Sequence, residues 1–109
     1  MVWFADSSKG YRNRLQITRD ILLAAGDGGT KKTHIMYRAN LSYHLLTRYL
    51  KDILAAGLIE CNDDSCYIVT KQGKAFLELY SSYERKSRKV AESYDDLTNG
   101  RKKLEKMLP

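Results

Sequence analysis

The residues best placed for covalent chemistry are Cys61 and Cys66, which flank Asp63-Asp64 in a β-prone stretch. If the two aspartates form a two-residue turn, Asn62 pairs with Ser65, and the cysteines lie directly opposite each other at a non-hydrogen-bonded site. The Cα atoms of such a pair are about 4.5 Å apart, within the range that a disulfide bridges. We therefore expect either a cross-strand disulfide or two packed thiols, the second if the loop is longer than two residues.

No other group of side chains has the spacing of a catalytic or metal-binding site. The C-x₄-C pair and two scattered histidines, His34 and His44, do not make the four-ligand pattern of a zinc site. The glycine-rich segment 26–29 is framed by neither a strand nor the Lys-Ser/Thr of a phosphate-binding loop, so we interpret it as a helix stop. We therefore expect no enzyme activity, no metal, no organic cofactor and no small-molecule substrate.

The basic side chains are the remaining candidates for binding, and they are concentrated in parts of the chain. The 109 residues include 19 Lys+Arg and 13 Asp+Glu, for a net charge of +6. Residues 31–57 carry a net charge of +4, residues 58–70 one of −3 and residues 71–109 one of +4. Two basic blocks around an acidic one are typical of a protein that binds a polyanion such as nucleic acid.

The composition points away from membrane and secreted proteins. A hydrophobic fraction of 43% is sufficient for a modest core. There is no run of about eighteen apolar residues, and the start of the chain lacks a basic region followed by an apolar stretch. We therefore expect a cytoplasmic protein without a membrane span, and since Pro109 is its single proline, nearly every internal position can be helical.

Three helices are predicted in the first half of the chain from the spacing of apolar residues and the position of capping residues. Each candidate begins after a serine or threonine that can cap it, and the first and third end at glycine. The first helix is capped by Ser7 or Ser8 and ends at Gly26. The second covers Lys31–Arg38 and is capped by Thr30. The third runs from Ser42 to Ala56 and ends at Gly57.

The third helix is amphipathic. At about 100° per residue, its large apolar side chains fall on one side, and four polar or basic side chains fall on the other. The apolar side is expected to be core. The other side is expected to be cationic, and it consists of His44, Thr47, Arg48 and Lys51.

Two β-prone runs follow at residues 58–62 and 65–69, with Asp63-Asp64 between them, which predicts a hairpin. Three helices followed by a hairpin make a winged helix-turn-helix. We therefore predict a mainly α fold with a β-hairpin, in which a winged helix-turn-helix domain occupies residues 7–70.

Residues 71–109 follow the period of a coiled coil. The stripe positions are separated alternately by four and three residues over more than four heptads. A helix from Phe76 to Leu108 would be about 48 Å long, so we expect it to pack against the same helix of a second copy. The alternatives are that it folds back on its own domain or that Asn99-Gly100 ends it. This heptad stripe comprises Phe76, Tyr80, Tyr83, Ser87, Val90, Tyr94, Leu97, Arg101, Leu104 and Leu108.

Several linked motifs resemble the archaeal winged-helix proteins of the Sulfolobus 10a family. They lie at residues 11–15, 30–37, 39–43, 57–59 with Leu50, and 67–76, and the match covers about residues 8–98. The resemblance implies a small, basic, chromosome-associated protein of thermophilic archaea. It also implies that the long C-terminal helices pair as an antiparallel coiled coil, which makes a homodimer with two DNA-binding heads.

The resemblance also implies which residues contact DNA. The helix from Ser42 would enter the major groove, and the start of the preceding helix would contact phosphate through side chains and free backbone N–H groups. Two arginines before the first helix could add phosphate contacts or be solvated surface charges. These candidates are Ser42, Tyr43, His44, Thr47, Arg48 and Lys51, then Lys31, Lys32 and Thr33, and finally Arg12 and Arg14.

We therefore expect a dimeric protein that binds double-stranded DNA mostly through phosphate charge and organises chromatin. The alternatives are a sequence-specific transcriptional regulator and a winged-helix module that binds protein. The hairpin tip, with Asp63-Asp64 near Glu60, is not expected to approach phosphate because like charges repel.

Overall fold

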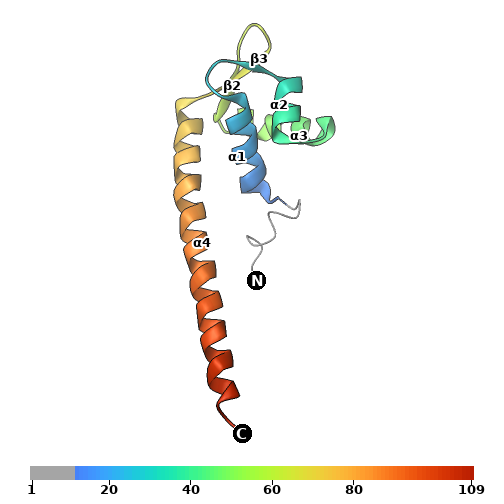
Figure 1. Cartoon of the computed structure of the whole chain (residues 1–109). Coiled ribbons are helices and arrows are strands. Elements are labelled where there is room, and N and C mark those ends of the chain that lie inside the picture. The colour runs from blue at the N-terminus through green and yellow to red at the C-terminus, as the bar shows by residue number, and fades with distance from the viewer. Residues whose placement is uncertain (1–11) are drawn as a thin grey trace. The chain divides into compact units, whose positions relative to one another are not determined.

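The structure is a computed structural model that describes residues 12–109 (Figure 1). It is mainly helical, with a small antiparallel sheet whose strand order is β1-β3-β2. Residues 12–80 form one compact unit, and residues 81–109 belong to a second. The elements are α1 Arg14–Ala25, β1 Thr30–Lys31, α2 Lys32–Ala39, α3 Tyr43–Ala55, β2 Ile59–Cys61, β3 Cys66–Val69 and α4 Lys71–Lys106. The predicted winged helix-turn-helix with a long C-terminal helix is thereby confirmed.

Helix α1 begins later than the sequence predicts. Asn13 caps it through a capping box, in which the Asn13 side chain accepts from Gln16 N and the Gln16 side chain accepts from Asn13 N. The expected caps Ser7 and Ser8 lie outside the described residues. Gly26 ends the helix with φ +64°, as predicted for a glycine stop.

The predicted role of Thr30 as a helix cap is wrong. Thr30 lies in β1, opposite Tyr67 of β3, and its hydroxyl donates to Ala25 O at 2.7 Å. Lys31 is the N-cap residue of α2 instead, and no side chain of residues 12–109 caps this helix. Thr30 is buried, and its backbone is part of the sheet, so pairing with β3 takes precedence over capping.

The core lies between the three short helices and the sheet. Its fully buried members are contributed by α1, α2, α3 and β2. Ser42 caps α3 by accepting from Leu45 N, and Gly57, at φ +76°, follows its end, both as predicted. The fully buried large side chains are Ile21, Leu22, Ile35, Leu46 and Ile59.

The hairpin is real, but its predicted register is wrong. Cys61 pairs with Tyr67, not with Cys66, and Asn62 N donates to Cys66 O across a three-residue loop. Ser65 in this loop has φ +60°, the left-handed residue that closes such loops. Both cysteines are free. Side chains alternate along a strand, so Cys66 points to the opposite face of the sheet from its neighbour Tyr67, and therefore also from Cys61, which pairs with Tyr67. The geometry on which the disulfide rested is therefore absent.

Helix α4 continues through Asn99-Gly100, so the alternative that this dipeptide ends the helix is wrong. At its start, Phe76 packs against the core and stacks on Tyr80, with ring centroids 6.5 Å apart. Within residues 12–109, no helix combines the length and apolar character that a membrane span requires.

Candidate nucleic-acid interface

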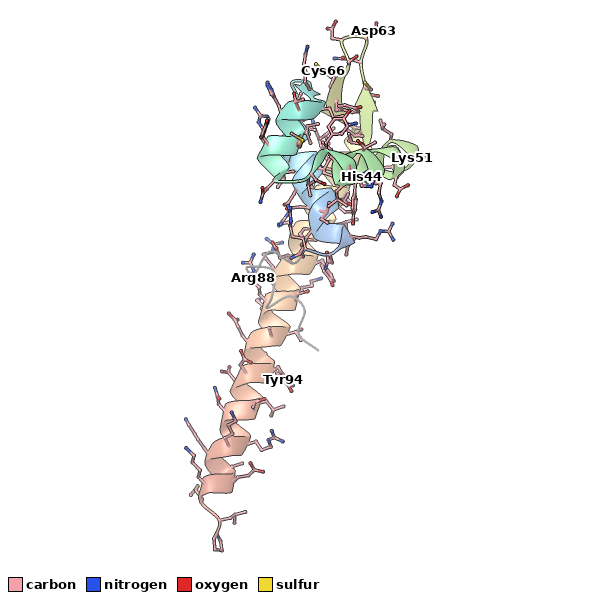
Figure 2. The ribbon with its side chains drawn as sticks, turned by 90° about the vertical axis from the view of Figure 1, so that its right-hand side faces the viewer. His44, Lys51, Asp63, Cys66, Arg88 and Tyr94 are labelled. Atoms are coloured by element: carbon pink, nitrogen blue, oxygen red, sulfur yellow. The ribbon has the colours of Figure 1, made fainter. Side chains whose placement is uncertain are left out.

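Helix α3 separates its apolar and polar faces as its sequence predicts. Leu46, Leu50 and Ile53 are buried in the core. The opposite face is exposed and carries the predicted set, of which Figure 2 labels His44 and Lys51. The structure therefore brings Tyr43, His44, Thr47, Arg48 and Lys51 together on the solvent-facing side of one helix.

The start of α3 is held by local bonds. Ser42 is occupied as the helix cap, and the Thr47 hydroxyl donates to Tyr43 O at 2.8 Å. The ammonium of Lys32 lies over the Tyr43 ring, 4.1 Å from its centroid. This contact joins α2 to the exposed face of α3. Spacing did not predict it, since the two residues belong to different helices whose crossing sets the contact.

The start of α2 adds two cations and an uncapped helix end. Lys31 and Thr33 are exposed, and Lys32 is half-buried beneath its contact with Tyr43. Because no side chain caps α2, its first N–H groups point to the end of the helix where anions bind favourably.

Of the two arginines near α1, only Arg14 joins this surface. It lines an open groove of about 300 Å³ with Arg48 and Lys51, and with Tyr49 and Asp52. Three cations against one carboxylate make this groove positive. A phosphate could therefore contact α1 and α3 together.

Arg12 has a structural role instead. Its Nη1 donates to Ala39 O at 2.7 Å and to Asp20 Oδ2 at 2.8 Å, and its Nη2 donates to Asn40 O at 2.8 Å. These bonds satisfy carbonyl groups at the end of α2. Arg12 is therefore not a candidate DNA contact in the folded protein.

The hairpin tip lies apart from the cationic face. Figure 2 shows Asp63 at the end of the β2–β3 loop, away from His44 and Lys51 on α3. Asp63 and Asp64 are exposed and make no ion pair within residues 12–109. The acidic tip therefore does not neutralise the cations of α3.

The second candidate surface is the heptad stripe of α4. Its first two members are not available to a partner, because Phe76 packs on the core and Tyr80 is 6% exposed. Arg19 also lies over the Tyr80 ring at 5.1 Å. From Tyr83 onward the large apolar members are exposed, with Leu97 at 73% and Leu104 at 67%. This exposed part of the stripe is unusual for a surface that stays in water.

Comparisons with known proteins agree with this architecture. A family model described as winged helix-turn-helix matches residues 11–88. An uncharacterized protein of Methanocaldococcus jannaschii is 27% identical over 73 residues, which are 67% of this chain and 75% of the relative.

Two solved structures share the fold at low sequence identity. Sso10a-2, a DNA-binding protein from Sulfolobus solfataricus, has a TM-score of 0.52 and 20% identity, over 90% of this chain and 98% of that chain. A MarR family protein of Mycobacterium tuberculosis, solved in complex with DNA, has a TM-score of 0.60 and 15% identity, over 99% of this chain and 86% of that chain. The predicted resemblance to the Sulfolobus 10a proteins is thus confirmed as a likeness of fold.

Proposed function

Because this chain belongs to the winged helix-turn-helix family, we propose that it binds double-stranded DNA through the exposed face of α3. The observation that carries the proposal is the sorting of α3 into a buried apolar face and an exposed face with Arg48 and Lys51. An α-helix fits the major groove of B-DNA, and the second helix of a helix-turn-helix is the one that enters it.

The surrounding cations support the same placement. Arg14 on one side and Lys31 and Lys32 on the other could contact phosphates that flank the groove. The DNA-binding proteins of similar fold, from Sulfolobus solfataricus and Mycobacterium tuberculosis, agree with this function.

We further propose that binding is largely independent of sequence and that the protein organises chromatin. Arg48 and Lys51 are the side chains on the exposed face of α3 that could read guanine with two bonds, and that face carries no Asn or Gln to read adenine. Most of its contacts would therefore be to phosphate. A sequence-specific regulator would instead show a clear base preference that depends on Arg48.

We propose that the DNA-binding unit is a homodimer joined through the exposed part of the heptad stripe. Burying Val90, Leu97 and Leu104 against a second copy would remove their apolar surface from water. An antiparallel arrangement, as the resemblance implies, would place one DNA-binding head at each end of the paired helices.

The test is the affinity for a short random-sequence duplex, measured by fluorescence anisotropy over a range of salt concentrations. For the unmodified protein, log affinity falls linearly with log salt, by about 0.9 per neutralised phosphate. The double variant Arg48→Ala, Lys51→Ala is expected to bind more weakly and to lower this slope by about 1.8.

The matched control is Lys71→Ala, Lys74→Ala, which removes the same charge from the start of α4. Lys74 pairs with Asp27 and lines a hollow with α1 residues, not the α3 surface. This control is expected to bind nearly as the unmodified protein does. Equal loss in both variants, or affinity that does not change with salt, would overturn the proposal. An Arg48→Ala effect confined to one base position would favour a regulator.

A further inference from the structure

The face of α4 opposite the heptad stripe carries charged pairs that repeat every seven residues and alternate in sign. Arg88-Lys89 is followed by Asp95-Asp96 and then by Lys102-Lys103. Seven residues advance a helix by about 10.5 Å. One more charge of the same sign lies near each pair. We call the resulting groups the proximal basic band (Arg85, Arg88, Lys89), the acidic band (Glu92, Asp95, Asp96) and the distal basic band (Lys102, Lys103, Lys106).

These bands are exposed and mostly lack partners among the residues that the structure describes. All nine side chains belong to exposed residues, and within residues 12–109 the one ion pair that they make joins Arg88 to Glu84 at 3.1 Å. Each band places like charges three or four residues apart, where they repel each other on a helix. The grouping therefore does not stabilise α4 itself.

The alternation of sign restricts what this face can bind. DNA would meet the acidic band with phosphate, which is repulsive, and an apolar partner would have to desolvate nine charges. A fitting partner must present the opposite signs at the same spacing. A second copy of this chain carries such a surface if it is displaced along the helix axis.

We propose that the charged face of α4 binds the charged face of a second copy in an antiparallel arrangement, with the acidic band of each copy against the distal basic band of the other. Glu92 and Lys106, Asp95 and Lys103, and Asp96 and Lys102 are each symmetric about position 99. One two-fold axis at Asn99 therefore forms all three pairs twice.

The other arrangements fit less well. A parallel pair in register would place each band against a band of the same sign. An antiparallel pair that sets Arg88-Lys89 against Asp95-Asp96 has its two-fold axis at Glu92, so the two Glu92 carboxylates would face each other. The axis at Asn99 avoids both repulsions, and it leaves the proximal basic band outside the overlap.

This contact is distinct from the heptad stripe, which lies on the opposite side of the helix; Figure 2 labels Tyr94 of the stripe and Arg88 of the charged face. If the stripe joins two chains, the charged face joins such dimers to one another. Exposed ion pairs are individually weak and are screened by salt. The assembly therefore forms at low salt, and it is strengthened where DNA holds many copies close together.

The test is sedimentation velocity of the full chain at about 10 mM and about 150 mM salt, where the Debye length falls from about 30 Å to about 8 Å. The unmodified protein is expected to form a larger species at low salt than at high salt. The acidic-band variant Glu92→Lys, Asp95→Lys, Asp96→Lys should weaken this association by about tenfold or more. The distal variant Lys102→Glu, Lys103→Glu, Lys106→Glu should do the same.

Charge exchange separates a specific contact from a general effect of charge. In an equal mixture of the two variants, each altered band faces an oppositely charged band, so the larger species is expected to return. The control Arg85→Glu, Lys89→Glu, outside the overlap, should assemble as the unmodified protein does. No salt-dependent larger species, no recovery in the mixture, or equal loss in the control would overturn the proposal.

The outcome does not depend on DNA binding. All the altered residues lie in α4 beyond residue 84, so each variant is expected to bind a short duplex through its head as the unmodified protein does. A failure of assembly with intact short-duplex binding would overturn this inference and leave the proposed function standing.

Discussion

Arg12 shows how one residue can look functional in the sequence and be structural in the fold. In the sequence, Arg12 lies close to Arg14 and is a second basic side chain near the start of a helix. In the structure its guanidinium reaches Ala39 and Asn40, which end α2. Sequence reasoning could not separate the two arginines, because the partners of Arg12 are backbone carbonyl groups more than twenty-five positions away.

The first prediction follows from this difference. Arg12→Ala leaves the carbonyls of Ala39 and Asn40 without their donor and removes one partner of Asp20, so it should lower the free energy of unfolding by about 1–3 kcal/mol. Arg14→Ala, on the exposed groove, should change it by less than about 0.5 kcal/mol. Urea denaturation followed by circular dichroism measures both changes.

The same two variants should have the opposite ranking in DNA affinity, with the larger loss for Arg14→Ala. Below the unfolding transition, Arg14→Ala weakens binding to the short duplex, whereas Arg12→Ala leaves it unchanged. A stable Arg12→Ala protein with reduced affinity would return Arg12 to the DNA contacts.

At the scale of elements, the helices and the hairpin strands were predictable, but strand β1 and the register of the hairpin were not. Apolar spacing and caps located α3 with its Ser42 cap, and heptad spacing located α4. Strand β1 has two residues and exists because β3 pairs with it, so Thr30 carries no local signal that distinguishes a strand from a cap. The register of the hairpin depends on the length of its loop. Because the loop has three residues and not two, Cys61 pairs with Tyr67 and not with Cys66.

The second prediction concerns the junction between β2 and α4. A Cβ atom on Gly73 would overlap Leu58 O and would lie 2.8 Å from Val69 Cγ1. Leu58 O cannot withdraw freely, since it accepts from Thr70 N at 3.1 Å. Gly73→Ala should therefore destabilise the DNA-binding head, the compact unit of residues 12–80, by about 3 kcal/mol, measured as a lower thermal midpoint.

Gly100 is the matched control within the same helix. Among the described residues nothing lies within 4 Å of a Cβ built there, so Gly100→Ala should stabilise α4 by about 1 kcal/mol through helix propensity alone. An unchanged midpoint in Gly73→Ala would mean that the contact between α4 and Leu58 is looser than the structure shows.

At the scale of the whole molecule, the heptad spacing of the sequence already indicates a second copy of the chain. The stripe predicts a partner for α4, and the structure leaves Val90, Leu97 and Leu104 exposed. The structure also shortens the part of the stripe that a second copy can contact. Phe76 and Tyr80 belong to the packing of the head, which spacing alone cannot show because a helix that leaves a domain has the same period on both sides of its boundary.

The last prediction tests this pairing and its consequence for DNA. Leu97→Asp places a charge in the centre of the exposed stripe, so it should shift the protein toward monomer in sedimentation equilibrium. Ser81→Asp adds the same charge at an exposed position outside the stripe and should leave the dimer intact. With two heads in one dimer, the second binding event on a long duplex is intramolecular, so Leu97→Asp should weaken long-duplex binding by about a hundredfold or more. Its affinity for a duplex that holds one head should not change. If Leu97→Asp remains dimeric, or weakens both duplexes equally, the two chains are not joined through this stripe.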